Sequence, residues 1–153
     1  MEGIMARLRG YAISVSVVMA LVLSGCGDDE PDLPTAAEAE VTLKNHINRA
    51  LEIISADDVK ITNPGGRDIP CGDGRYKRTY AATARDRITS GDPNTLVLML
   101  NGALDGLAEY EAVTTDLTRM DLANKRLHTK IILSSPGRHE ISVQGETECL
   151  PAA

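Results

Sequence analysis

The segment from Leu127 to Cys149, LHTKIILSSPGRHEISVQGETEC, predicts two antiparallel strands joined by the polar turn Ser134–Gly137. Apolar or small residues alternate with polar ones on both sides of the turn: Leu127, Thr129, Ile131 and Leu133, then Ile141 and Val143. We expect Gly145 to form a bulge in the second strand. Cys149 has the parity of the apolar positions, so its side chain is expected to point inward.

Further strands are predicted upstream of this hairpin. The same alternation marks three segments, Val59–Thr62, Tyr76–Arg87 and Val113–Leu117. Ile69–Arg75 is expected to be an irregular loop, and Arg119–Asn124 a polar link. Arg78 breaks the alternation of its strand, so its guanidinium group must reach solvent or find a carboxylate partner.

Two helices are predicted between these strands. Thr35 and Glu38 form a capping-box pattern ahead of a helix from Ala36 to Ala56. Asp92-Pro93 is a second helix start, followed by apolar residues at helical spacing up to Leu107. A strand from Thr95 to Leu100 is the alternative for this second segment.

The order of elements is therefore helix, two strands, helix, three strands, which predicts an α+β fold. We expect one antiparallel sheet of about four to five strands, with both helices packed on one face, in a single domain over residues 35–153. The 153 residues carry a net charge of −6 and only 3% aromatic side chains. This acidic balance argues against a nucleic-acid partner.

Residues 1–25 have the pattern of an export signal. Arg7 and Arg9 precede the apolar run Tyr11–Leu23, which is too short to span a bilayer as a helix. The run ends in Leu23-Ser24-Gly25-Cys26, which resembles the lipobox of bacterial lipoproteins, and this resemblance implies lipidation of Cys26. An ordinary secretory signal with a chance cysteine is the alternative.

Cleavage before Cys26 would leave residues 26–153, with a net charge of −7. Residues 26–34 are acidic and contain Pro, which predicts a solvated tether between the membrane anchor and the domain. The resemblance thus implies a protein held on the extracytoplasmic side of the cell membrane by the lipid on Cys26.

The other two cysteines, Cys71 and Cys149, are predicted to form a disulfide, because an exported chain meets oxidising conditions. Closing the loop between them would stabilise the fold by roughly 4 kcal/mol in the chain-entropy model. Two unpaired thiols are the alternative.

The chain also resembles small actinobacterial lipoproteins of uncharacterised function. The resemblance rests on the lipobox, on the C-terminal segment Gly145–Pro151 (GETECLP) and on Asp116–Arg119 (DLTR). It implies a location and a fold of this size, and it supplies no activity.

The strongest candidate for a binding surface is a group of cationic residues on predicted strands. The selected residues are Lys77, Arg85, Arg126, His128 and Lys130. If the helices cover one face of the sheet, these side chains would line the other and attract an anionic envelope polymer or an acidic protein partner. An ordinary solvated sheet face is the alternative.

No catalytic motif is present in the sequence, and no metal or cofactor is expected. His128 and His139 flank the C-terminal hairpin, next to Glu140, so a hydrolase or metal-dependent enzyme using both histidines is one alternative. A structural component of the envelope is another. The leading hypothesis is a membrane-anchored binding or interaction module.

Overall fold

A computed structural model describes residues 33–114 and 116–152. In chain order, its elements are α1 (Ala36–Ile53), β1 (Asp57–Asn63), β2 (Ile69–Gly72), β3 (Arg75–Lys77), β4 (Thr79–Arg85), α2 (Pro93–Asp105), β5 (Glu111–Ala112), β6 (Arg119–Asn124), β7 (Thr129–Ser134), β8 (Glu140–Thr147) and β9 (Leu150–Pro151). The strands form a six-stranded sheet in the order β1-β4-β8-β7-β6-β5 and a three-stranded sheet in the order β2-β3-β9. The α+β class is confirmed, with more strands than the four to five expected.

Both helices begin where the sequence predicts. Thr35 and Glu38 form the reciprocal capping box of α1, which ends at Ile53, slightly before the predicted Ala56. The Asp92 carboxylate accepts the backbone N–H of Thr95 at 3.0 Å at the start of α2. The alternative of a strand after Pro93 is therefore wrong.

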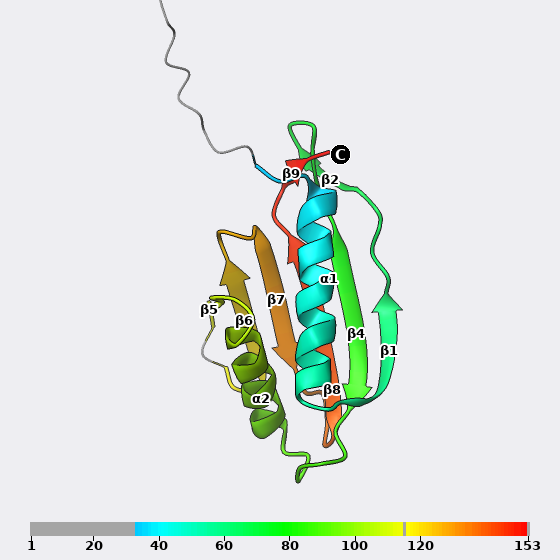
Figure 1. Ribbon diagram of the computed structural model, residues 1–153, viewed down its shortest axis with the longest axis vertical. Helices are drawn as coiled ribbons and strands as arrows, with labels where there is room; N and C mark the ends of the chain where they lie inside the picture. Colours follow the sequence, from blue (N-terminus) through cyan, green and yellow to red (C-terminus); the bar gives the residue numbers. More distant parts are fainter. Residues whose placement is uncertain (1–32, 115, 153) are drawn as a thin grey trace, which may run out of the picture. The chain divides into compact units, whose positions relative to one another are not determined.

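The two helices pack against the same face of the six-stranded sheet, α1 over β4 and β8 and α2 beside it (Figure 1). We call this side the covered face and the opposite side the open face. The strand residues of the covered face that belong to the core are Tyr80, Ala82, Ala84, Met120, Leu122, Ile131, Leu133, Ile141 and Val143. Because alternate strand residues point to opposite faces, their neighbours in sequence form the open face.

Gly145 does not form the expected bulge. β8 pairs in unbroken register through this residue with Tyr80 of β4 and Ile131 of β7. A Cβ atom at Gly145 would lie 2.6 Å from a methyl group of Leu43 and 2.9 Å from one of Ile47, both on α1. The missing side chain therefore lets α1 approach the centre of the sheet.

Two predictions were wrong around Leu117: the strand at Val113–Leu117 and the polar link at Arg119–Asn124. Within the described part of Val113–Leu117 there is no strand, and Val113 is 68% exposed. The predicted polar link is instead β6, whose Met120 and Leu122 face the core while Arg119 and Asp121 alternate with them. Its charged residues, Arg119 and Asp121, lie on the open face and pair with each other, so they did not prevent a strand.

The expected loop at Ile69–Arg75 is mostly a small hairpin, made by β2 and β3. The predicted strand Tyr76–Arg87 is divided at Arg78 into β3, which joins the small sheet, and β4, which joins the large one. The guanidinium group of Arg78 pairs with Asp68 at 2.7 Å and Glu40 at 3.1 Å, as the broken alternation required.

The predicted disulfide between Cys71 and Cys149 is confirmed, with the two Cα atoms 6.0 Å apart. It joins β2 to the link between β8 and β9. Cys149 is exposed, so the expectation that its side chain points inward was wrong. Thr147, two residues earlier, is the last residue that follows the inward parity, because β8 ends there.

Candidate ligand-binding hollow

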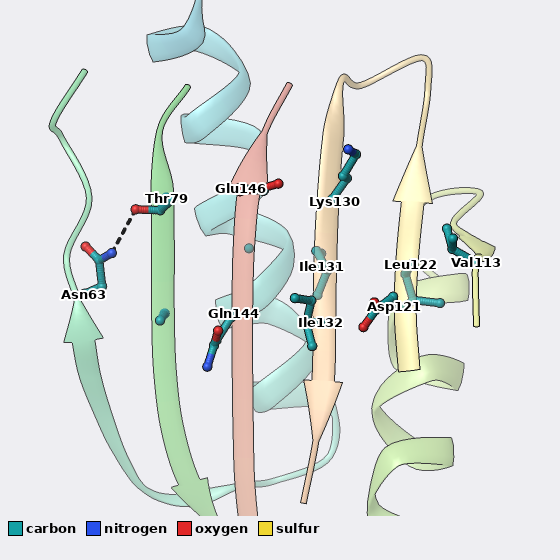
Figure 2. Close-up of a pocket in the computed structure, with 12 residues that line it drawn as sticks. Asn63, Thr79, Val113, Asp121, Leu122, Lys130, Ile131, Ile132, Gln144 and Glu146 are labelled. Atoms are coloured by element: carbon teal, nitrogen blue, oxygen red, sulfur yellow. Dashed lines mark hydrogen bonds between the residues drawn. The ribbon is translucent and has the colours of Figure 1, made fainter. Parts of the chain in front are cut away.

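The open face of the large sheet carries a hollow of about 460 Å³, a volume within the range of small-molecule sites. We call it the sheet hollow. It extends across the sheet from Asn63 in β1 to Val113 after β5 (Figure 2). Open-face side chains of β4, β8, β7 and β6 project into it: Thr79, Ala81, Gln144, Glu146, Lys130, Ile132 and Asp121. The helices do not cover this side of the sheet, so the hollow is open to solvent.

The chemistry of the sheet hollow is mixed. Ile132 and Ala81 provide apolar surface in the hollow, and Gln144 of β8, which is paired with both in the strand register, offers an amide between them. Asn63 and Thr79 hydrogen-bond to one another at 2.9 Å at the β1 side. An apolar floor with a few polar groups is typical of a site that orients an amphipathic ligand.

Two charged groups in the sheet hollow have incomplete partners. The Oδ1 atom of Asp121 is buried and accepts no hydrogen bond from any residue in the described ranges, while the nearest cation, Arg119, is 3.4 Å from it. Lys130 is exposed and pairs with no carboxylate in the part of the chain that the structure describes. The ion pair with Arg119 offsets part of the cost of burying this oxygen, and the Asp121 side chain is still 35% exposed, so its carboxylate can meet a donor from outside the protein.

The five predicted binding residues do not form one basic surface. Lys77 donates to Glu146 at 2.9 Å, and Lys130 lies beside Glu146 across the β7–β8 pairing, so these two lysines border the sheet hollow. Arg85 lies at the other end of β4, opposite Glu140. The remaining two, Arg126 and His128, lie in the turn between β6 and β7. Carboxylates alternate with cations along the open face.

The structure separates the two histidines of the enzyme hypothesis. His128 precedes the end of β7 that pairs with Thr147, whereas His139 precedes the other end of β8. The six residues of β7 between those ends span about 20 Å. Within the described residues there is also no group of three potential metal ligands. The geometry therefore gives no support to a reaction that uses both histidines.

Each of these histidines is held by a carboxylate. The Nδ1 atom of His128 lies 2.9 Å from Glu148, and that of His139 lies 3.3 Å from Asp86. Burial alone would raise the pKa of the Asp86 carboxyl, but hydrogen bonds from Thr89, Ile88 and His139 outweigh it and lower that pKa. This cluster fastens the segment before α2 to the start of β8.

Glu40 on α1 is, like Asp86, a buried carboxylate that the sequence analysis did not single out. Its side chain is 4% exposed and bonds to Lys44 at 3.0 Å, to Arg78 at 3.1 Å and to the backbone N–H of Gly66 at 2.6 Å. Burial opposes ionisation, but these donors together lower the pKa of the Glu40 carboxyl. Its place between Ala39 and Leu43 on the apolar side of the helix was the available signal. The cluster links α1 to the β1–β2 loop, and Glu40 is not among the residues that line the sheet hollow.

Cys26, the predicted lipidation site, lies outside the described residues. Neither described helix is long and apolar enough to cross a membrane. Comparison of the chain with family models, with curated proteins and with solved structures gave no match.

Proposed function

We propose that this protein is a lipid-anchored, extracytoplasmic binding module that holds a component of the cell envelope in the sheet hollow. The observation that carries the proposal is a hollow on an uncovered sheet face in which the Asp121 Oδ1 atom and the Lys130 ammonium group lack full partners. The anchoring part rests on the lipobox pattern at Leu23–Cys26.

The lining residues favour a ligand of defined chemistry. A hydroxyl or amide group would donate to the exposed part of the Asp121 carboxylate, an anionic group would pair with Lys130, and an apolar portion would cover Ile132. An anionic envelope polymer or an acidic segment of a protein provides such groups. This narrows the predicted partner to one that also has apolar surface.

A pair of matched substitutions tests the site. Ala81 and Ala123 both lie on the open face, but only Ala81 lines the sheet hollow. We expect Ala81→Tyr to fill the hollow and abolish binding to isolated envelope fractions, whereas Ala123→Tyr retains it. Equal binding by both variants, measured on washed wall, polysaccharide and lipid fractions, would remove the hollow as the site.

The anchor is tested separately. We expect mass spectrometry of the exported protein to find a diacylglyceryl group on Cys26 at a new N-terminus. A chain that begins at residue 27 should be released from membrane fractions by washing at high salt, whereas the lipidated chain should remain bound. An intact thiol at Cys26 in membrane-bound protein would contradict lipidation without bearing on the hollow.

A further inference from the structure

One end of the domain holds the point where the N-terminal segment enters. We call it the entry end: Leu33–Ala39, Arg67–Lys77, Lys125–Lys130 and Glu146–Pro151. The start of α1 packs there on Leu150 and Tyr76, and Figure 1 shows β2, β9 and the β6–β7 turn toward the same end. The N–H of Glu148 donates to the carbonyl of His128, which fixes that turn to the rest of the entry end.

Several exposed cations from separate elements lie at the entry end. They are Arg67, Arg75, Lys125, Arg126 and Lys130. None of them forms an ion pair with another residue in the ranges 33–114 and 116–152. They come from the β1–β2 loop, β3, the β6–β7 turn and β7, so the three-dimensional fold brings them together.

The carboxylates of the same end are already engaged. Glu38 belongs to the capping box, Asp68 pairs with Arg78, Glu146 with Lys77 and Glu148 with His128. Asp73 is the one described carboxylate there that no described donor contacts. Around α2 and β5 the balance is reversed, with the exposed acids Asp105, Glu109, Glu111 and Asp116. The described part of the domain is therefore polarised: more exposed cations without a described ion pair lie at the entry end than elsewhere, where they are Lys60, Arg85 and Arg138.

We propose that the entry end lies on an anionic lipid surface, with phosphate headgroups paired to Arg67, Arg75, Lys125 and Arg126, while Lys130 remains available to the sheet hollow that it lines. The proposal rests on the proposed lipid anchor at Cys26. The seven residues from Cys26 to Leu33 reach at most about 25 Å, which limits the distance between the domain and the bilayer. An anchored domain cannot move farther than this from the bilayer, and its cationic end is the end that the anchor holds closest.

This orientation has a consequence for the sheet hollow. β4, β7 and β8 extend lengthwise from the entry end, with β8 antiparallel to the other two (Figure 1). With that end on the bilayer, the open face stands upright, and the sheet hollow faces sideways into the envelope. A ligand then reaches it without passing under the domain.

Vesicle binding by residues 27–153 tests the proposal, since this chain keeps the described core and both disulfide cysteines but cannot be acylated at Cys26. We expect sedimentation with phosphatidylglycerol-containing vesicles, loss of binding at high salt, and no binding to phosphatidylcholine alone. Replacing Arg75, Lys125 and Arg126 with Gln should weaken binding on the order of a hundredfold, at roughly fivefold for each charge.

The matched control replaces Lys60, Arg85 and Arg138 with Gln. These exposed cations lie away from the entry end and change the net charge equally. Binding within roughly twofold of the unsubstituted chain is expected for this control. An equal loss in both triple variants would overturn the proposal, because net charge alone would then explain the binding.

The acidic tether is the competing occupant of the entry end. It carries Asp28, Asp29, Glu30 and Asp32 next to the entry point. If residues 27–153 fail to bind anionic vesicles, and the chain with these four replaced by Asn or Gln binds them, the tether and not the membrane covers the entry end. Failure of both chains to bind also overturns the proposal. Neither result depends on Cys26 lipidation or on a ligand in the sheet hollow.

Discussion

Two neighbouring residues of β7 show how differently the two faces of the large sheet are used. Ile131 points to the covered face, where it is fully buried beneath the helices. Ile132 points to the open face, where it lines the sheet hollow and keeps contact with solvent. An isoleucine therefore stabilises the fold at position 131, while the isoleucine at position 132 is available to a ligand. Most of the stabilisation from burying apolar side chains comes from the covered face. The residues of the open face are therefore less constrained by folding and can serve binding.

The largest expected effect comes from truncating the covered member of this pair. Ile131→Ala should lower the free energy of unfolding by about 3–4 kcal/mol, because it leaves a cavity beneath the helices. Ile132→Ala should lower it by less than about 1 kcal/mol. Urea unfolding of the oxidised protein measures both. Similar losses for the two variants would show that the open face is also covered, either by a ligand or by another molecule.

Sequence patterns located the covered face well. Ile131, Leu133, Ile141 and Val143 all point inward as the alternation predicts, because burial on one face requires that period. β6 was missed because its open-face residues are charged and Asn124 occupies one of its buried positions. The Asn124 amide donates to the carbonyl of Glu109, a contact that spacing in the sequence does not reveal.

The candidate site was less predictable than the fold. Lys77 and Lys130 were selected as cations, but the sequence could not show that Glu146 lies between them. The sheet hollow depends on which open-face side chains are short, such as Ala81, and on the unmatched Asp121 carboxylate. Both features depend on which side chains the strand order and register bring together, and residue spacing in a single sequence does not predict these.

Substitutions at two glycines test whether the close approach of α1 to the covered face needs a residue without a side chain. Gly145→Ala should lower the free energy of unfolding by about 1–2 kcal/mol, since the added methyl group meets Leu43 and Ile47. Gly102→Ala in α2 has open space and should raise it by up to about 1 kcal/mol through helix propensity. Thermal unfolding compares the two variants. A neutral Gly145→Ala would mean that α1 can move away from the sheet without loss.

The smallest expected effect concerns a polar contact within the covered side. The Nδ1 atom of His46 on α1 lies 3.0 Å from the hydroxyl of Tyr110, which in turn lies 3.2 Å from the Thr129 hydroxyl at the start of β7. Burial lowers the pKa of His46. In the folded protein this imidazole therefore takes up its proton at a lower pH than in the unfolded chain, where the pKa is about 6.5.

The unfolded chain thus binds more protons in this range, so stability from His46 is complete above pH of about 6.5 and declines as the pH falls toward the folded-state pKa. We expect His46→Gln to flatten the decline between neutral and mildly acidic pH, by less than the two effects above because the ring is only half-buried. Tyr110→Phe should retain the slope, since burial is the cause of the shift. Urea midpoints measured across this pH range give the slopes, and an unchanged slope in His46→Gln would assign the acid sensitivity to other groups.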